Sequence, residues 1–358
     1  MSAISYERYS GAAFFPFGIS FSMASTSHRG NSFDILRICA ALAVIVCHHY
    51  YIIDHEGPSW MNVGMIGGVA VMTFFTISGY LVTTSWLREP HLVKFSAKRL
   101  LRLWPGMLAA VVLNIFVFGL LFTNLPAREF LSHGQTLEYF KNLLLYRAYV
   151  NLPGVFVHNP LSTLMNGPLW TIPIETMCYA ALAAAGVVGV FRQRWIATFA
   201  LLGYILVFIV GYNADFWGVM MHGYEYPAYF ACGALIALHR DRFLPHAAAI
   251  TFGLIPIALF FWLTGLQHTS GLLVLPALLI YLGSTTSVFS GWVSRLGDPS
   301  YGVYLSGCPI AQTVYALWPS MNFYASMALS CVLSMLLGYL LWHWIEAPAL
   351  RLKRLLTR

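Results

Sequence analysis

Ionisable residues stand at both ends of an apolar stretch, FDILRICAALAVIVCHHYY, at residues 33–51. Arg37 and His48 are eleven residues apart, which on an α-helix places them on nearly the same face, roughly 16 Å apart along the axis. Asp34 lies three residues before Arg37 on that face and can pair with it. His49 points about 100° away, so we expect the two histidines to have different roles. The ionisable residues on this face could anchor the helix, or they could carry out acid–base chemistry.

A second ionisable residue in an apolar setting is Glu175, within NGPLWTIPIETMCY. Of the thirteen acidic residues, we expect only Glu175 to lie well inside a helix, which would begin near Pro168. Glu175 would then lie roughly 10 Å below the outer boundary, at a depth similar to that of His48. A buried carboxylate–imidazole pair is one interpretation. A structural hydrogen bond between two helices is the other.

A dense cationic patch follows in REPHLVKFSAKRLLRLWPG. Lys94, Lys98, Arg99 and Arg102 supply the charge, and Arg99 and Arg102 are adjacent on a helical face. Guanidinium groups bind phosphate in bidentate geometry, so the patch suits a polyanion. Anchoring of a membrane helix by basic residues explains the charge equally well.

Small residues interrupt two apolar segments, FFTISGYL and LGDPSYGVYLSGCPI. The first contains Ser78 and Tyr80, and the second contains Tyr301, Tyr304 and Ser306. Small residues let helices approach closely, and they also leave room for a ligand. We expect helix packing to be the commoner reason here and regard the tyrosines and Ser306 as candidates for a pocket.

The composition indicates whether these residues lie in water or in a membrane. The chain has 358 residues, of which 59% are hydrophobic and 9% charged, and its mean hydropathy is +0.69, whereas soluble domains carry about 25% charged residues. About 20 apolar residues span a bilayer as a helix. We therefore predict an all-α, polytopic membrane bundle of about ten transmembrane helices. The predicted spans are 35–53, 64–86, 104–123, 168–190, 195–212, 223–238, 247–265, 271–289, 300–318 and 323–345.

The basic residues favour an even number of spans with both termini in the cytoplasm, because positive charge stays on that side. All but Arg128, Lys141 and Arg147 would be cytoplasmic, which is 17 of the 20 basic residues. The net charge of +7 then reflects topology and contact with anionic lipid, and nothing indicates nucleic acid. We divide the chain into a cytoplasmic extension at 1–30, a ten-span domain at 31–350 with an outer loop near 124–167, and a basic tail at 351–358. Met23 is an alternative start.

The cysteines and the other histidines indicate no metal site. All six cysteines lie in apolar spans without a CxxC pair, so we expect small core residues and neither disulfides nor zinc. The cluster HHYYIIDH, with His48, His49, Asp54 and His55, would suit a di-metal oxidase or desaturase. Such sites need several histidine clusters, and the remaining histidines are scattered singly.

Six segments in order resemble the membrane acyltransferase type 3 family. They are FDILRICAALAVIVCHH, FFTISGYL, KRLLRLWP, GPLWTIPIE, GDPSYGVYLSG and WIEAPALRL, and together they cover about residues 31–354. Each segment alone is weak evidence for the family, but the six segments in this order are specific to it. The resemblance implies a ten-span enzyme of the bacterial cytoplasmic (inner) membrane that transfers an acyl group, usually acetyl from cytoplasmic acetyl-CoA, to a hydroxyl of a polysaccharide or lipid-linked sugar.

The resemblance also implies roles for residues. His48 matches the catalytic histidine, with Arg37 and Asp34 in the same motif, and Glu175 matches an acidic position. Donor binding is expected from Arg99 and Arg102. The acyl-CoA would be a co-substrate, with no tightly bound cofactor and no metal; the partners would be the glycan acceptor and the bilayer.

The residues suggest how such an enzyme would work. Lys98, Arg99 and Arg102 would hold the coenzyme A phosphates, with Ser78 and Tyr80 near the donor arm. Neutral His48 would either deprotonate the acceptor hydroxyl or accept the acyl group itself. Tyr80, Ser306 or backbone amides near Gly79 are candidate oxyanion donors.

Alternatives to this mechanism stay open. A ten-span, proton-coupled transporter or flippase of a glycan-related solute would use His48, Glu175 and Arg37 as a relay. An acyltransferase of another membrane family, acting on a sterol or a lipid, is a further alternative with a different class of acceptor.

Overall fold

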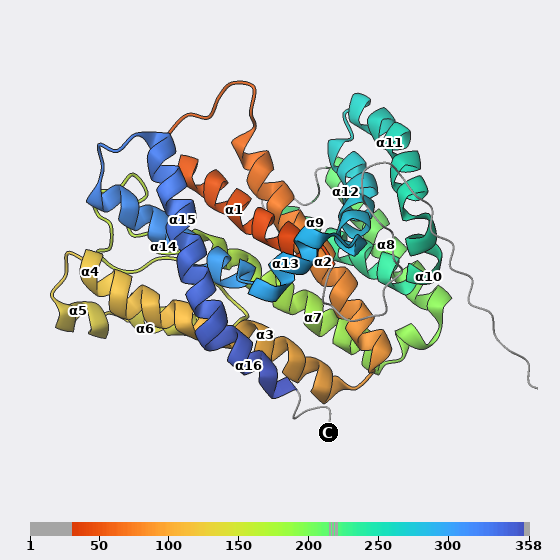
Figure 1. Ribbon diagram of the computed structural model, residues 1–358, viewed down its shortest axis with the longest axis horizontal. Coiled ribbons are helices and arrows are strands. Elements are labelled where there is room, and N and C mark those ends of the chain that lie inside the picture. Colours follow the sequence, from red (N-terminus) through yellow and green to blue (C-terminus); the bar gives the residue numbers. More distant parts are fainter. Residues whose placement is uncertain (1–30, 215, 217, 219–220, 354–358) are drawn as a thin grey trace, which may run out of the picture.

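The computed structural model describes residues 31–353 except 215, 217, 219 and 220 (Figure 1). The predicted extension at 1–30, the alternative start Met23 and most of the predicted tail, residues 354–358, lie outside this range. The described residues form helices and turns with three isolated β-bridges and no strand. The all-α prediction is therefore confirmed for the part of the chain that the structure describes.

In the described part of the chain, ten helices of 17 or more residues make up most of the bundle, and shorter 3₁₀, π or α segments join or extend them. The long helices are α1 (Phe33–Ile52), α2 (Val63–Arg88), α3 (Leu92–Leu113), α7 (Thr171–Val187), α8 (Arg194–Asn213), α9 (Met221–Leu238), α11 (Ala247–Leu263), α12 (Gln267–Ser284), α14 (Ser300–Leu317) and α15 (Phe323–Leu341). The short segments are η1 (Asn114–Gly119), α4 (Leu120–Phe122), α5 (Ala127–Ser132), α6 (Gly134–Tyr139), η2 (Phe140–Leu144), η3 (Gly167–Trp170), η4 (Val190–Arg192), α10 (Arg240–Phe243), η6 (Leu244–His246), α13 (Val288–Leu296), η7 (Trp342–Glu346) and α16 (Ala347–Arg351).

Six helical stretches are long and apolar enough to cross a membrane, among the residues described. They are Phe33–Ile52, Val63–Arg88, Leu92–Phe122, Arg194–Asn213, Arg240–Leu263 and Phe323–Arg351. A helix also occupies each of the other four predicted windows, but α7, α9, α12 and α14 have only 17 or 18 residues. Three of them carry an internal proline, Pro227, Pro276 or Pro309. The chain is thus a multi-pass membrane protein, and a count of ten complete spans is not confirmed.

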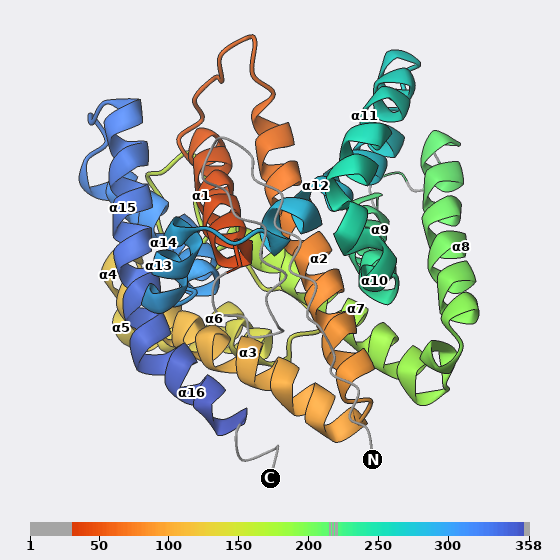
Figure 2. The ribbon, with the colours of Figure 1, turned by 45° about the vertical axis from the view of Figure 1, so that its right-hand side comes forward.

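Helix α2 lies at the centre of the bundle, where it packs closely against α9 and α1 (Figure 2). A Cβ atom at Gly79 would lie 2.0 Å from the carbonyl oxygen of Phe230, and one at Gly233 would lie 2.1 Å from that of Thr76. Only glycine permits this approach of two helix backbones. Close packing, rather than a ligand, therefore explains Gly79 of FFTISGYL. Helices α8 and α11 lie at the edge of the bundle and bury few residues.

The segment 124–167 is folded against the bundle. Phe130, Tyr139 and Met165 have no exposed surface. The side-chain amide of Asn159 donates to Oε1 of Gln312 at 2.7 Å, and that of Asn166 donates to the carbonyl oxygen of Leu305 at 2.7 Å. These bonds join the segment to α14, so its buried part is a fixed element of the core.

The cysteines are all free thiols, and their surroundings differ. Four of them are buried and Cys331 is half-buried, but Cys39 is exposed on α1. The expectation that all six are core residues is wrong for Cys39, because its position on α1 faces away from the neighbouring helices.

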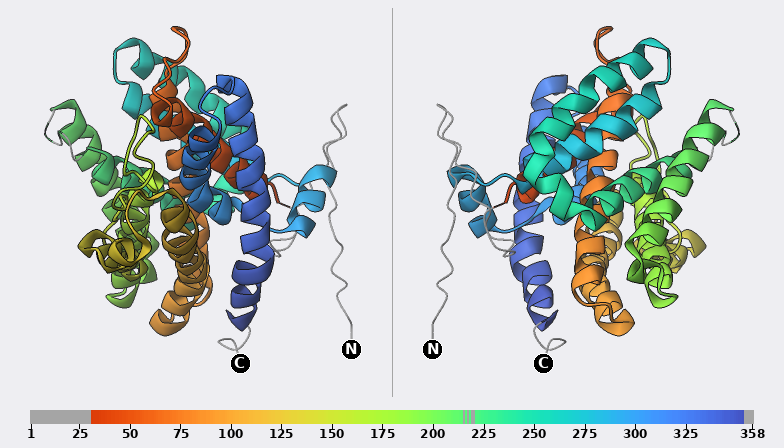
Figure 3. Two further views of the ribbon diagram at one scale, coloured as in Figure 1. Left: turned by 90° about the vertical axis from the view of Figure 1, so that its left-hand side faces the viewer. Right: turned by 90° about the vertical axis from the view of Figure 1, so that its right-hand side faces the viewer.

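One end of the molecule gathers basic side chains. The C-terminal end of α2, the N-terminal end of α3 and the end of α16 meet there, while residues 53–62 connect α1 to α2 at the opposite end (Figures 1 and 2). Arg88, Lys94, Lys98 and Lys353 belong to this end, which we call the basic end. Lys94, Lys98, Arg99 and Arg102 precede the span predicted at 104–123, but all four lie on α3, which begins at Leu92. Short helix α13 lies at one side of the bundle and leads through residues 297–299 into buried α14 (Figure 3).

Candidate active site

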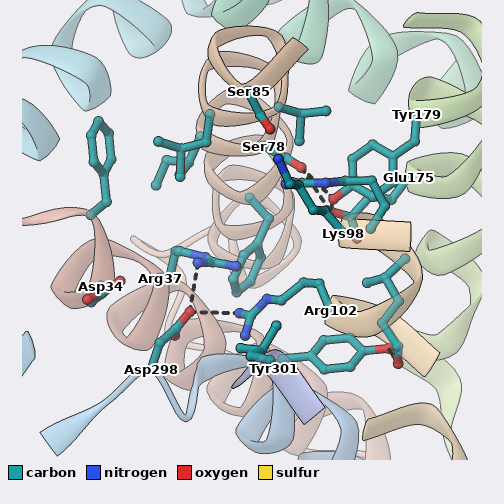
Figure 4. A pocket seen from close by; sticks show the side chains of 18 of the residues that line it. Asp34, Arg37, Ser78, Ser85, Lys98, Arg102, Glu175, Tyr179, Asp298 and Tyr301 are labelled. Atoms are coloured by element: carbon teal, nitrogen blue, oxygen red, sulfur yellow. Dashed lines mark hydrogen bonds and ion pairs between the residues drawn. The ribbon is translucent and has the colours of Figure 1, made fainter. Parts of the chain in front are cut away.

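A cavity of about 440 Å³ opens among α1, α2, α3, α7 and α14 (Figure 4). Along α2 its lining runs from Arg88 at the basic end to Val71 at the deep end, a distance of about 26 Å along a helix. The predicted site residues that line it are Asp34, Arg37, Ser78, Lys98, Arg99, Arg102, Glu175, Tyr301 and Tyr304. Three predicted residues, His48, Tyr80 and Ser306, are absent from this lining.

Asp298 joins two of the arginines in the cavity wall. Its Oδ2 atom accepts hydrogen bonds from Arg37 Nη1 at 2.7 Å and from Arg102 Nη2 at 2.7 Å. Arg102 Nη1 also lies 3.3 Å from Oε2 of Glu346, which is 1% exposed. One carboxylate from the loop before α14 thus links α1 to α3.

The expected pairing of Asp34 with Arg37 is wrong. Arg37 turns its guanidinium toward Asp298, and Asp34 lies apart from this pair at the edge of the cavity (Figure 4). The physical reason is that Asp298 already bonds Arg102 and Ser300, so it offers Arg37 a fixed carboxylate. A pairing across 261 residues has no signature in local spacing.

Arg99 lines the same cavity without a carboxylate partner among the described residues. Its guanidinium lies over the rings of Phe95 at 5.8 Å and Tyr179 at 5.9 Å from the centroids. Its Nε atom is buried and has no hydrogen-bond partner in this structure. Burying an unpaired cation is costly, so this position favours an anionic ligand.

Glu175 forms a cluster of oxygen atoms with Ser78 and Tyr179. Ser78 Oγ donates to Glu175 Oε1 at 2.9 Å and lies 2.8 Å from the hydroxyl of Tyr179, which also donates to Glu175 Oε1. Glu175 is half-buried and faces the cavity. It therefore contacts α2 from α7, midway along the cavity, and it does not pair with His48 as one interpretation expected.

His48 lies beyond the deep end of the cavity. Its Nδ1 atom is 2.9 Å from the carbonyl oxygen of Val44. A carbonyl can only accept, so Nδ1 carries a proton and neutral His48 has its lone pair on Nε2. A Cβ atom at Gly167 of η3 would lie 3.9 Å from His48 Cδ2. The imidazole therefore lies beside η3, and His48 is not part of the cavity lining.

His49 has different surroundings, as the helix geometry predicted. It has no exposed surface, its Nε2 lies 2.8 Å from Ser326 Oγ, and its ring packs 5.3 Å from that of Phe323. His55 stacks on the same Phe323 ring at 3.9 Å. Among the described residues, no group of three or more His, Cys, Asp or Glu could hold a metal ion.

The two tyrosines of the predicted pocket both line the cavity and are anchored by hydrogen bonds. Tyr301 donates to the carbonyl oxygen of Leu103 at 3.1 Å, and Tyr304 donates to that of Pro168 at 2.8 Å. Ser306 is buried and bonds the carbonyl oxygen of Val303 at 3.3 Å. It has no surface on the cavity, so its proposed roles in a pocket and as an oxyanion donor are not supported.

Tyr80 also faces away from the cavity. Residues two apart on a helix point about 200° apart, and because Ser78 faces the cavity, Tyr80 packs instead against Phe33 with 5.7 Å between ring centroids. Gly79 faces α9. The donor-binding role expected of Tyr80, and the oxyanion role suggested for it and for amides near Gly79, therefore lack support from the geometry.

Residues that the sequence did not single out complete the rim at the basic end. Glu89 bonds Lys94 at 2.8 Å and also bonds Lys98, and these two hydrogen bonds lower the pKa of Glu89 to about 2. Burial, together with Arg99 and Arg102, lowers the pKa of Lys353 to about 7. Lys353 was counted only as part of the basic tail, and its place in the cavity follows from the path of α16.

Asp298, Glu346 and Tyr179 are further residues of the site that sequence reasoning missed. Asp298 and Glu346 stand inside GDPSYGVYLSG and WIEAPALRL, and a carboxylate within an apolar segment was the available signal.

A third buried carboxylate lies outside the cavity. Glu225 of α9 has no exposed surface and bonds Nδ1 of His222 at 3.1 Å and Nδ1 of His268 at 2.5 Å. The expectation that Glu175 is the one acidic residue well inside a helix is therefore wrong. Glu175 was recognised because its sequence neighbours are apolar. Tyrosines surround Glu225 in HGYEYPAYF, so Glu225 did not stand out in the same way.

The helices and the cavity define a multi-pass membrane protein with a deep pocket suited to an anionic ligand. Residues 31–343 match the family of acyltransferase domains, and the chain belongs to this family. The match covers most of the chain and confirms the resemblance to membrane acyltransferases. No solved structure matches the chain.

The names of three relatives agree with membership of this family. An O-acetyl transferase of Shigella phage Sf6 is 29% identical over 344 residues, which cover 92% of this chain and 97% of the relative. Nodulation protein 10 of Rhizobium leguminosarum bv. viciae is 30% identical over 44% of each chain. Acyltransferase MdmB of Streptomyces mycarofaciens is 23% identical over 40% of this chain and 36% of the relative. The family and the phage relative support the expected enzyme class, an O-acetyltransferase.

Proposed function

We propose that this enzyme transfers an acetyl group from acetyl-CoA to a hydroxyl of a cell-surface polysaccharide or lipid-linked sugar in the bacterial cytoplasmic membrane. The basic end would face the cytoplasm, with both termini on that side, because positively charged segments stay there. No tightly bound cofactor is needed for this chemistry. The proposal rests on the acyltransferase family together with the chemistry of the cavity.

The unpaired Arg99 is the observation that carries the donor proposal. Arg99 is half-buried, and its guanidinium, whose Nε atom is buried, has no carboxylate partner in the described residues, whereas Arg37 and Arg102 share Asp298. Phosphate oxygens would satisfy it in bidentate geometry. The cavity runs inward from the basic end past Arg99, so a phosphate-bearing donor would keep its headgroup at the rim and extend its acyl arm inward.

His48 is the proposed base at the inner end of this path. Its Nδ1–H bonds Val44, which fixes the ring and leaves Nε2 free to take a proton from the acceptor hydroxyl. The hydroxyl oxygen would then form the ester bond to the acyl carbon as the carbon–sulfur bond breaks, and the thiolate of coenzyme A would leave. Alternatively, Nε2 would first attack the acyl carbon as the carbon–sulfur bond breaks and the thiolate leaves. The hydroxyl oxygen would then attack the same carbon as its bond to Nε2 breaks, and the hydroxyl proton would pass to the freed Nε2.

Glu175 would act from the cavity wall. Because it bonds Ser78 and Tyr179 rather than His48, we propose that the cluster contacts the donor arm midway along its path. Arg37 and Arg102 would be held by Asp298 as the cationic floor beside Arg99. Asp34, which bonds neither arginine, would have no direct role.

Binding of acetyl-CoA tests the donor proposal directly. Arg99→Gln should weaken the binding of acetyl-CoA by at least about tenfold, since a hydrogen bond to a charged group contributes about 1.5–3 kcal/mol. Isothermal titration of the purified protein in nanodiscs would measure this. Arg128→Gln, at an exposed position on α5, is the matched control. Equal affinities in both variants would contradict the role of Arg99, and solute flux without thioester turnover would favour a transporter.

Lys353 should make donor binding depend on pH. Because its pKa lies at about 7, the amine is charged at pH 6 and neutral at pH 8, so affinity for the anionic donor should fall as pH rises through 7. Arg remains charged at both values. We expect Lys353→Arg to abolish most of this decline in affinity with pH. The Lys353→Met variant should bind the donor weakly at both pH 6 and pH 8. The measurement is the dissociation constant of acetyl-CoA between pH 6 and 8; an unchanged slope in both variants would refute this role.

A further inference from the structure

The cavity lining ends at Val71 along α2, and this deep end combines apolar side chains with two hydroxyl groups. Its apolar residues are Val71, Phe74 and Ile172, and its hydroxyl groups belong to Thr171 and Tyr304. The cationic side chains all lie nearer the basic end. The cavity therefore changes from a site for an anion to a site for a small apolar group along its length.

Tyr304 is fixed in place by partners from two other elements. Its hydroxyl lies 2.6 Å from Thr171 Oγ1 and donates to the carbonyl oxygen of Pro168 at 2.8 Å. Its ring packs against Phe74 at 5.7 Å with the rings 75° apart, and the residue is 6% exposed. With α2, η3 and α7 all in contact, the ring has no free direction in which to move.

The deep end lies only a short distance beyond the middle of the cavity. Ser78 and Glu175 mark the middle of the cavity, and Phe74 lies four residues beyond Ser78 on α2, a distance of about 6 Å. Gly67 contacts Cys47, one residue before His48, and Val71 lies one helical turn nearer the basic end. The deep end is thus about one helical turn short of the level of His48.

We propose that Tyr304 and Thr171 close an acyl-binding subsite that admits an acetyl group and excludes longer acyl chains. The inference rests on the proposed donor, an acyl-CoA, and specifies which acyl groups the site accepts. Additional methylene groups would meet a packed, hydrogen-bonded ring, and overfilling a packed site is unfavourable. A hydrophobic pocket is expected to discriminate by about tenfold or more between ligands that differ by one methylene group.

The test is the binding of coenzyme A thioesters of increasing chain length to the full protein in nanodiscs. The probes are acetyl-CoA, butanoyl-CoA and hexanoyl-CoA, with coenzyme A itself as the reference. The wild-type protein should bind acetyl-CoA at least about tenfold more tightly than hexanoyl-CoA. Tyr304→Ala should reduce this ratio to less than about threefold, because it removes the ring. Tyr304→Phe keeps the ring and should retain the wild-type ratio.

A second variant keeps the inference testable if Tyr304→Ala does not fold. Phe74→Leu shortens the facing wall at a half-buried position and should lower the same ratio at least about threefold. Equal binding of all three thioesters to the wild type, or an unchanged ratio in the enlarging variants, would overturn the inference alone. Failure of the folded wild type to bind any of the four probes would overturn the proposed donor, and the acyl subsite with it.

Discussion

Replacement of His48 by alanine should reduce acetyl transfer by about 10²–10⁴-fold, the range associated with loss of a general base. The expectation follows from the bond between Nδ1 and Val44, which leaves Nε2 as the free lone pair of the neutral ring. Since His48 lies outside the cavity lining, the affinity for acetyl-CoA should not change. Transfer of labelled acetyl from acetyl-CoA to the membrane glycan fraction of inverted vesicles would measure the rate.

His49→Ala is the matched control for this prediction. His49 is buried and bonded to Ser326, so its loss should lower the free energy of unfolding by about 1–3 kcal/mol, as for other buried polar groups left unpaired. Transfer per folded molecule should stay near the wild-type rate. Transfer that survives His48→Ala would remove His48 from the mechanism, whichever of the two routes applies.

Local spacing predicted the elements of the bundle better than it predicted their lengths. Apolar runs located a helix in each predicted window because burial of apolar residues drives both helix packing and membrane insertion. Helices α7, α9, α12 and α14 have 17 or 18 residues and are not among the described stretches that are long and apolar enough to cross a membrane. Buried polar groups such as Glu225 in α9 and Gln312 in α14 lower the apolar character of these helices.

Residues of the candidate site could be predicted from the sequence where the face of a single helix determines what they contact. Arg37, Arg99, Arg102 and Glu175 all line the cavity, and the separation of His48 from His49 follows from the helix repeat. Their partners were not predictable in this way. The depth of Glu175, counted from an assumed helix end, took no account of η3 and the orientation of α7, which direct it toward Ser78.

Partners that are distant in sequence depend on how loops enter the core. Asp298 reaches Arg37 and Arg102 because Gly297 adopts a φ of +95°, a conformation that suits glycine, just before α14 begins. Its carboxylate also accepts hydrogen bonds from the backbone amide and hydroxyl of Ser300. Sequence shows that Gly297 and Asp298 precede a helix, but it does not show which arginines they will meet.

Asp298→Asn should be the most destabilising conservative substitution in the cavity wall. The amide keeps the shape of the side chain but removes the charge that Arg37 and Arg102 share through one oxygen atom. Arg37 would then lose its carboxylate partner and Arg102 would keep only its longer contact with Glu346 at 3.3 Å, and breaking a buried ion pair costs about 3–5 kcal/mol. We expect the apparent free energy of unfolding, from denaturation in mixed micelles, to fall by that amount.

The matched control for Asp298→Asn is Asp241→Asn, because Asp241 pairs with Arg194 at an exposed position. An exposed ion pair contributes about 0–1 kcal/mol, so this variant should unfold nearly as the wild type does. Equal stabilities of the two variants would contradict the view that Asp298 holds α1 against α3. Any bound donor stabilises the folded state by mass action. If acetyl-CoA stabilises Asp298→Asn more than it stabilises the wild type, the donor phosphates have replaced the missing carboxylate, which would place the anion-binding site at Arg37 and Arg102 as well as at Arg99.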